Sequence, residues 1–175
     1  MPFITELAKF KNKIFIETGT YQGDTTQLVF DLGFPKVITM ELSVVFYKRC
    51  ISRFENNPNI KVIFGNSKYD LTNVIQNIDS PITFWLDSHW SGVIDIGYDP
   101  DTICPVLEEL EQIKSHYIKN HTIMVDDIRL MDGKHFPVLR SEIEAKIMSI
   151  NSNYTIEYFD DFTSSEDILV AYIKS

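Results

Sequence analysis

Residues 14–26 read Ile-Phe-Ile-Glu-Thr-Gly-Thr-Tyr-Gln-Gly-Asp-Thr-Thr, which predicts a buried β-strand, a tight loop and the start of a helix. Glu17 ends the apolar run, and Gly19 and Gly23 follow it. Glycine lets a backbone turn sharply and lets a ligand approach closely, because it has no Cβ. A strand that runs through such a loop into a helix N-terminus is typical of the cofactor crevice in an open α/β sheet.

The loop differs from the common nucleotide-binding fingerprints. Its two glycines do not form the three-glycine pattern of dinucleotide-binding folds, and no lysine follows them to make a P-loop. An acid at the strand end suits a cofactor that carries a positive charge and an amino group, and S-adenosylmethionine (SAM) has both. Another nucleotide, or a turn that binds no ligand, remains an alternative at this point.

The length of the chain and its net charge limit the number of domains and the kinds of partner that the protein can have. The chain has 175 residues and a formal net charge of −9, and its length predicts one domain, residues 1–175. The negative charge argues against nucleic acid as the main partner, because phosphate binding needs a basic face. No apolar run is long enough to span a membrane, and the first residues do not read as a signal peptide. We therefore expect a cytoplasmic protein, with Cys50 and Cys104 as buried free thiols.

Strand and helix patterns alternate along the chain. Alternating βα units predict a parallel sheet with helices on both faces, and the last two strands, joined by a polar turn, must pair antiparallel. We expect a Rossmann-like, doubly wound, mostly parallel seven-stranded sheet with a C-terminal antiparallel β-hairpin, a layout typical of class I SAM-dependent methyltransferases. The predicted strands are 13–18, 37–41, 60–64, 82–87, 121–125, 154–159 and 168–173, and the predicted helices are 3–10, 24–32, 43–54, 69–77, 105–116 and 137–150.

Doubly wound sheets bind ligands at the carboxyl ends of their strands. Glu41 ends the second strand, where a carboxylate can accept hydrogen bonds from both ribose hydroxyls, although a solvated strand end is the alternative. Asn66 follows the third strand and can donate to and accept from an adenine edge, unless residues 65–67 form a simple turn. The predicted cofactor-binding residues are Glu17, Thr18, Gly19, Thr20, Tyr21, Gly23, Thr25, Glu41, Leu42, Asn66, Ser67 and Asp87.

Carboxylates also end the fourth and fifth strands. Asp87 ends the fourth, and Asp126 and Asp127 end the fifth. Three like charges close together are costly unless a cation or a proton neutralises them. An all-oxygen set favours a hard ion such as Mg²⁺, Mn²⁺ or Ca²⁺, which would lower the pKa of a bound hydroxyl. A metal-free acid/base site is one alternative, and Asp127 acting as a loop or helix cap is another.

Aromatic and histidine side chains lie close to Asp87 in the sequence. His89 is a candidate general base beside Asp87, because its ordinary pKa is near neutral; a histidine bonded to a loop carbonyl is the alternative. We expect Trp85 in the core, and Trp90 either on a pocket wall or on the loop surface.

The remaining polar candidates have structural interpretations. His116 and His121 flank a predicted helix–strand turn, so we expect them at the surface. His135 follows the acid pair and could face the pocket, but a surface position is favoured. We expect Arg129 to form a salt bridge with Asp132, with substrate binding as the alternative.

Several motifs together resemble a family of small class I SAM-dependent methyltransferases of bacteria and giant viruses. They run from about residue 13 to 173: Phe-Ile-Glu-Thr-Gly-Thr-Tyr-Gln-Gly-Asp-Thr, Met-Glu-Leu-Ser, Phe-Gly-Asn-Ser, Phe-Trp-Leu-Asp-Ser-His-Trp-Ser-Gly, Cys-Pro-Val-Leu-Glu-Glu-Leu-Glu and Val-Asp-Asp-Ile-Arg. The acid triad is also similar to that of macrocin-type sugar O-methyltransferases. The resemblance implies a divalent ion on Asp87, Asp126 and Asp127, and Mg²⁺-dependent methylation of a sugar or glycan hydroxyl.

The chain departs from these relatives at three places. Asn66 stands where they usually carry aspartate, residues 91–99 differ from their glycine-rich loop, and the first predicted strand starts close to Met1, whereas the macrocin-type enzymes have longer N-terminal segments. We expect an open acceptor site, suited to a large glycan or completed by a second subunit in a homo-oligomer. Two alternative functions are a metal-independent methyltransferase on another small acceptor and a SAM-binding protein without catalysis; the broken fingerprint disfavours a nicotinamide-dependent oxidoreductase.

Overall fold

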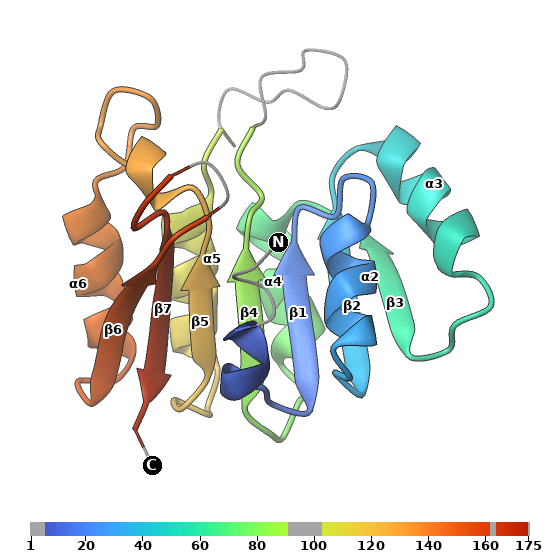
Figure 1. Ribbon diagram of the computed structural model, residues 1–175, viewed down its shortest axis with the longest axis horizontal. Helices are drawn as coiled ribbons and strands as arrows, with labels where there is room; N and C mark the ends of the chain where they lie inside the picture. The colour runs from blue at the N-terminus through green and yellow to red at the C-terminus, as the bar shows by residue number, and fades with distance from the viewer. Residues whose placement is uncertain (1–5, 91–102, 162–163, 175) are drawn as a thin grey trace.

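The computed structural model describes residues 6–90, 103–161 and 164–174, and a seven-stranded sheet lies at its centre (Figure 1). The strand order is β3-β2-β1-β4-β5-β7-β6. The first five strands pair in parallel, and β7 runs antiparallel between β5 and β6, which confirms the predicted sheet and hairpin. The strands are β1 (Ile14–Thr18), β2 (Lys36–Glu41), β3 (Ile60–Phe64), β4 (Ile82–Leu86), β5 (Thr122–Val125), β6 (Tyr154–Phe159) and β7 (Ile168–Ile173).

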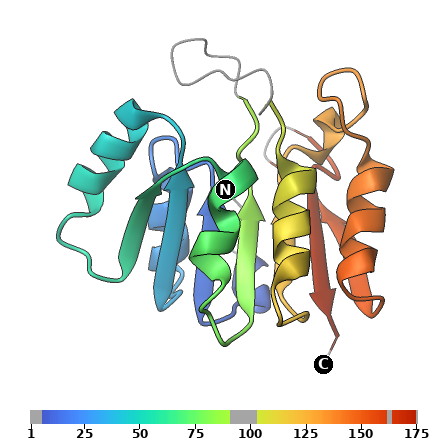
Figure 2. The same cartoon turned by 180° about the vertical axis from the view of Figure 1, so that it is seen from behind.

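Helices cover both faces of the sheet, because neighbouring strand residues point to opposite sides. Phe15 and Trp85 belong to one core, against helices α2 (Asp24–Asp31) and α3 (Val44–Phe54). Ile16 and Phe84 belong to the other core, against α4 (Ser67–Ile75), α5 (Val106–Ser115) and α6 (Arg140–Ile150), which Figure 2 shows from behind. The predicted core position of Trp85 is confirmed. Two short 3₁₀ helices, η1 (Leu7–Phe10) and η3 (Ile128–Leu130), complete the described elements.

Side-chain caps decide where two helices begin. The Ser43 hydroxyl accepts a hydrogen bond from the Phe46 N–H at the start of α3, as its position predicts. Asn66 Oδ1 accepts the Lys68 N–H at 3.0 Å, so α4 begins at Ser67, two residues before the predicted 69–77. Ser43 follows β2 and Asn66 follows β3. Helices α3 and α4 therefore both begin at the carboxyl ends of the parallel strands.

The loop after β1 is held between two neighbouring strands. The Gly19 and Thr20 N–H groups both donate to the Met40 carbonyl of β2, at 3.0 and 3.2 Å. Gly19 has φ +86°, and a Cβ there would lie 2.1 Å from the Asp87 carbonyl oxygen beyond β4. Only glycine fits a positive φ with a backbone so close. The ends of β1, β2 and β4 therefore meet at one place.

The predicted surface positions of His116 and His121 are wrong. Both rings are buried at the opposite end of the sheet, and His116 Nδ1 lies 3.0 Å from His121 Nε2. His121 Nδ1 accepts the Ile82 N–H at 3.1 Å, so its proton is on Nε2 and is donated to His116. Burial and the neighbouring His116 lower the pKa of His121 to about 3. This bond satisfies both nitrogens of His121, whereas His116 Nε2 is buried without a hydrogen-bond partner among the described residues.

Three further expectations can be compared with the described residues. Cys50 is buried as predicted, whereas Cys104 is partly exposed, and both are free thiols. No helix within the described ranges is long and apolar enough to cross a membrane.

Candidate active site

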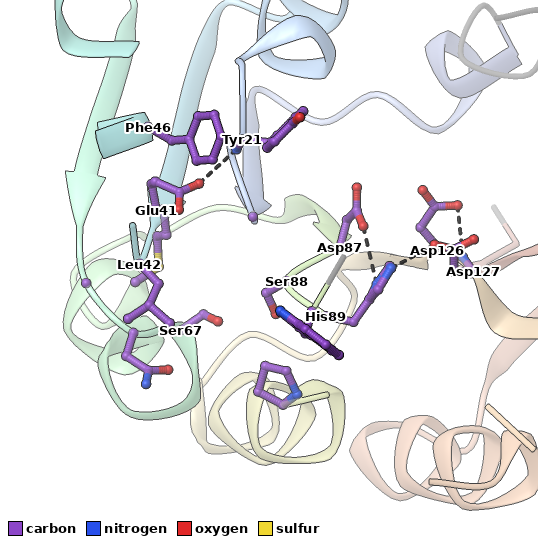
Figure 3. Close-up of a pocket in the computed structure, with 16 residues that line it drawn as sticks. Tyr21, Glu41, Leu42, Phe46, Ser67, Asp87, Ser88, His89, Asp126 and Asp127 are labelled. Carbon is purple, nitrogen blue, oxygen red and sulfur yellow. Dashed lines mark hydrogen bonds and ion pairs between the residues drawn. The ribbon is translucent and has the colours of Figure 1, made fainter. Parts of the chain in front are cut away.

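A cavity of about 310 Å³ lies over the strand ends, between the β1–α2 loop and the ends of β4 and β5 (Figure 3). Its volume is in the usual range for small-molecule sites. Seven of the predicted cofactor residues line it: Gly19, Tyr21, Glu41, Leu42, Asn66, Ser67 and Asp87. The other lining residues are Met40, Phe46, Gly65, Ser88, His89, Trp90, Pro105, Asp126 and Asp127.

The remaining predicted cofactor residues, Glu17, Thr18, Thr20, Gly23 and Thr25, are not on the cavity wall. The Glu17 carboxyl is buried and accepts hydrogen bonds from the Thr26 hydroxyl and, at 2.6 Å, from the Thr39 hydroxyl. Burial raises the pKa of Glu17 to about 7. Glu17 therefore connects β1 to α2, through Thr26, and to β2, through Thr39, below the β1–α2 loop.

Glu41 occupies one end of the cavity, with its carboxylate held by two backbone donors. The Tyr21 N–H donates to Oε2 at 2.8 Å, and the Ser43 N–H donates to Oε1 at 2.7 Å. Burial raises the pKa of Glu41, and these hydrogen bonds oppose the rise. Each carboxylate oxygen keeps a second lone pair. Glu41 can therefore accept from two ligand hydroxyls in a fixed geometry.

An acidic cluster with a central histidine occupies the other end (Figure 3). His89 Nε2 lies 2.7 Å from Asp127 Oδ2, and His89 Nδ1 lies 3.4 Å from Asp87 Oδ1. Asp126 Oδ1 accepts the Asp127 N–H at 2.9 Å. The Phe136 ring packs against the imidazole, with centroids 5.1 Å apart. The structure thus brings together all the predicted catalytic and metal-binding residues.

The four groups of this cluster shift each other's pKa values. Burial alone would lower the pKa of His89, but the hydrogen bond with Asp127 and the Asp87 charge raise it. The hydrogen bond from His89 lowers the pKa of Asp127 to about 2. Burial and the Asp126 charge raise the pKa of Asp87, and burial and the Asp127 charge raise that of Asp126 to about 6. These shifts favour a protonated His89 paired with an ionised Asp127.

The same cluster fits a divalent cation. Asp87, His89 and Asp127 each offer one ligand atom, and these atoms lie within 4.8 Å of one another. His89 replaces Asp126 in this group, although Asp126 lines the same cavity. Two carboxylates and an imidazole suit Mn²⁺ and related ions as well as Mg²⁺.

The predicted salt bridge between Arg129 and Asp132 is wrong. Arg129 Nη1 lies 2.5 Å from Asp127 Oδ1 and also pairs with the buried Asp167 at the start of β7. Asp132 accepts the N–H groups of residues 134 and 135 within its own turn, and it pairs with the His135 ring. The His135 ring is exposed, which confirms the surface position favoured from the sequence. The Asp132 carboxylate is engaged by hydrogen bonds within its own turn. Arg129 therefore pairs with Asp127 and Asp167, which lie next to strands β5 and β7.

Trp90 lines the cavity, and its backbone N–H donates to the Ile103 carbonyl at 2.8 Å. The predicted acceptor loop, residues 91–99, lies outside the described residues.

Comparisons with known proteins identify the fold. No family model and no curated protein match the sequence. An O-methyltransferase from Bacillus cereus, solved with S-adenosylhomocysteine (SAH), has a TM-score of 0.68 at 15% identity, over 98% of this chain and 79% of its own. The O-methyltransferase TomG from Streptomyces achromogenes, solved with SAM, has a TM-score of 0.64 at 11% identity, over 99% and 78%.

A third similar structure is an rRNA methylase from Streptococcus thermophilus, with a TM-score of 0.62 at 12% identity, over 99% of this chain and 95% of its own. Such likenesses show that the chain has the Rossmann-like fold of class I methyltransferases. Because proteins with different acceptors share this fold, the acceptor has to be argued from the site.

Proposed function

We propose that the chain is a SAM-dependent O-methyltransferase. One observation carries the proposal: a single cavity joins an oriented acid, Glu41, to the cluster of Asp87, His89, Asp126 and Asp127. With Glu41 at one end of the cavity and the acidic cluster at the other, the site suits a ligand that has ribose hydroxyls at one end and a reacting group at the other. Two of the similar structures hold SAM or SAH in this fold.

The lining residues suggest how SAM would lie. Glu41 would accept from the ribose hydroxyls, as its two backbone donors leave lone pairs available. Asn66 and Ser67 would lie beside the adenine. Asn66 Oδ1 already accepts the Lys68 N–H, so its amide nitrogen is the group suited to donate. Gly19 would let the amino-acid part approach Asp87.

In the reaction, an acceptor oxygen attacks the methyl carbon of the sulfonium. The O–C bond forms as the C–S bond breaks, and the electron pair passes to sulfur, which leaves neutral SAH. Asp87 is the better proton acceptor, because burial raises its pKa. His89 tends to keep its proton between two carboxylates and so acts by positioning and charge. Catalysis would depend mainly on placing the reactants.

We further propose that a divalent cation binds Asp87, His89 and Asp127, with Asp126 beside them, and that the acceptor is a sugar or glycan hydroxyl. When bound, such an ion lowers the pKa of a hydroxyl and holds it near the methyl group. The donor set supports the ion, and the resemblance to sugar O-methyltransferases supports the acceptor.

A metal-independent methyltransferase is a second candidate, favoured by one observation. His89 already connects Asp87 and Asp127 through both ring nitrogens. A protonated imidazole there can balance the acids without a metal ion.

Calorimetric titration of SAM and SAH, with Mg²⁺ or with EDTA, tests these proposals. We expect both ligands to bind, and we expect Mg²⁺ to add heat that disappears in Asp87→Ala and persists in the control Asp132→Ala, outside the cavity. Absence of binding by either ligand would refute the methyltransferase proposal. Binding with equal transfer in EDTA, measured with methyl-labelled SAM and glycan acceptors, would select the metal-independent candidate; binding without transfer to any acceptor pool would indicate a SAM-binding protein.

A further inference from the structure

Arg129, in the 3₁₀ helix η3 after β5, shares the Asp127 carboxylate with His89. Arg129 Nη1 lies 2.5 Å from Asp127 Oδ1. On the other side of the carboxylate, His89 Nε2 lies 2.7 Å from Oδ2 (Figure 3). Each oxygen of Asp127 therefore has a cationic or hydrogen-bonding partner within the protein. Arginine keeps its charge in proteins, so a divalent cation that binds Asp127 has to share this carboxylate with a second positive charge.

A buried acid holds Arg129 in this position. Asp167, directly before β7, is 0% exposed. Its Oδ1 accepts the Arg129 backbone N–H at 3.1 Å, its Oδ2 pairs with the Arg129 guanidinium, and its carbonyl accepts the Ile128 N–H at 2.8 Å. A buried carboxylate is costly without a cation, so removing the guanidinium from Asp167 is unfavourable. Arg129 therefore stays beside Asp127 when another cation arrives.

The backbone of Asp127 is fixed as well. Its φ is +53°, in the left-handed region that residues other than glycine rarely adopt. The Asp127 N–H donates to Asp126 Oδ1 at 2.9 Å, and the Asp127 carbonyl accepts the Leu130 N–H at 2.9 Å. The carboxylate thus meets Arg129 and His89 from one position, set by the turn between β5 and η3.

We propose that Arg129 is a positioning residue that competes with the divalent cation for Asp127, and that it thereby keeps the metal site weak and readily exchanged. The inference rests on the proposed function, because it concerns the cation proposed for Asp87, His89 and Asp127. The guanidinium and the cation carry like charges and meet at one carboxylate, so each lowers the affinity of Asp127 for the other. Such competition explains how one cluster can have both a metal-binding donor set and internal partners for its acids.

The test measures Mn²⁺ binding to the protein alone, by calorimetry and by the paramagnetic resonance signal of free Mn²⁺. We expect Arg129→Gln to bind Mn²⁺ at least about tenfold more tightly than the wild-type protein, since a like charge in contact with a ligand weakens binding on that scale. Arg129→Lys keeps the charge, and we expect an affinity close to wild type. The control Arg140→Gln removes the same charge from an arginine that pairs with Glu144 outside the cavity, and we expect wild-type affinity there.

A gain in affinity separates competition from a purely structural role, because loss of a structural arginine would weaken the site. Adding Asp87→Ala to Arg129→Gln should abolish the gain, which would place the added binding at this cluster. Arg129→Gln leaves the buried Asp167 without its cation. If that variant does not fold, the double variant Arg129→Gln/Asp167→Asn removes both charges, and we expect it to bind Mn²⁺ more tightly than wild type too.

Equal or weaker Mn²⁺ binding in the folded single or double variant would overturn the proposal. A gain of the same size in Arg129→Lys would also overturn it, since the charge of Arg129 would not then be what competes. Absence of Mn²⁺ binding from every protein would overturn both this inference and the proposed metal site. SAH binding to the wild-type protein, measured separately, tests the proposed methyltransferase function, so the two failures are distinguishable.

Discussion

Glu17 and Glu41 end neighbouring strands, but their surroundings give them different roles. Hydroxyls of Thr26 and Thr39 surround the Glu17 carboxyl below the loop, whereas backbone N–H groups hold the Glu41 carboxylate at the cavity. The sequence predicts both as ligands of the cofactor, because position at a strand end is all that it shows. Which strand-end acid faces the cavity depends on the neighbouring strand, which supplies Thr39.

At Glu41, we predict that Glu41→Gln weakens SAH binding by about tenfold to a hundredfold. The amide would place a donor against the Tyr21 or Ser43 N–H and would remove one acceptor from the ribose hydroxyls. Calorimetric dissociation constants measure the effect. Glu55→Gln, on an exposed residue after α3, is the charge-matched control. Equal SAH affinity in the wild-type and Glu41→Gln proteins would show that Glu41 does not bind the ligand.

Among elements, the strand ends are the part of the fold that the sequence predicts best. Apolar runs that stop at an acid or glycine mark β1, β2, β4 and β5 within a residue or two, and parallel order brings their ends together. This is why Asp87, Asp126 and Asp127 meet as predicted.

Helix surfaces and turns are predicted less well, because their contacts come from distant segments. Val106, Leu110 and Ile113 mark the buried stripe of α5, and Glu109 lies within it. An acid in an apolar stripe is a signal of a buried hydrogen-bonded carboxylate, but its partner, the Ser88 hydroxyl, cannot be read from spacing. The paired imidazoles at the other end of α5 are similar, since each histidine alone reads as a surface residue.

At the β1–α2 loop, we predict that Gly19→Ala destabilises the fold by roughly 2 kcal/mol or more and abolishes measurable SAH binding. The added Cβ would meet the Asp87 carbonyl oxygen at 2.1 Å and would separate β1 from β4 at the cavity. Urea unfolding and calorimetry measure the two effects.

Gly133→Ala is the matched control for this change, because Gly133 also has a positive φ, +75°, outside the cavity. Its Cβ would meet only the end of the Leu139 side chain, at 3.1 Å. We expect a loss of about 1 kcal/mol from the backbone strain, with SAH affinity unchanged. Retained SAH binding in Gly19→Ala would mean that the close approach of β1 and β4 does not shape the site.

For the whole molecule, two buried groups make stability depend on pH in opposite directions. The pKa of Glu17 is about 7 in the fold, above its ordinary 4.5, so its contribution is complete below pH 4.5 and is lost as pH rises through 7. The pKa of His121 is about 3, below its ordinary 6.5, so its contribution is present above pH 6.5 and is lost as pH falls toward 3. Between these limits each group changes the free energy of unfolding by about 1.4 kcal/mol per pH unit, with opposite sign.

Replacing one of these groups should therefore leave the pH dependence of the free energy of unfolding that the other group causes. We predict that the free energy of unfolding of Glu17→Gln rises relative to the wild-type protein between pH 5 and 6.5, by roughly 2 kcal/mol, because the penalty of ionising a buried acid is gone. His121→Asn should fall relative to wild type over the same range by a similar amount, since the wild-type protein alone regains its neutral buried histidine. Urea unfolding at three pH values measures both differences, with the exposed His135→Asn as control. If all four proteins give parallel profiles, Glu17 and His121 have their ordinary pKa values in the fold, and neither group makes the stability depend on pH in the way predicted.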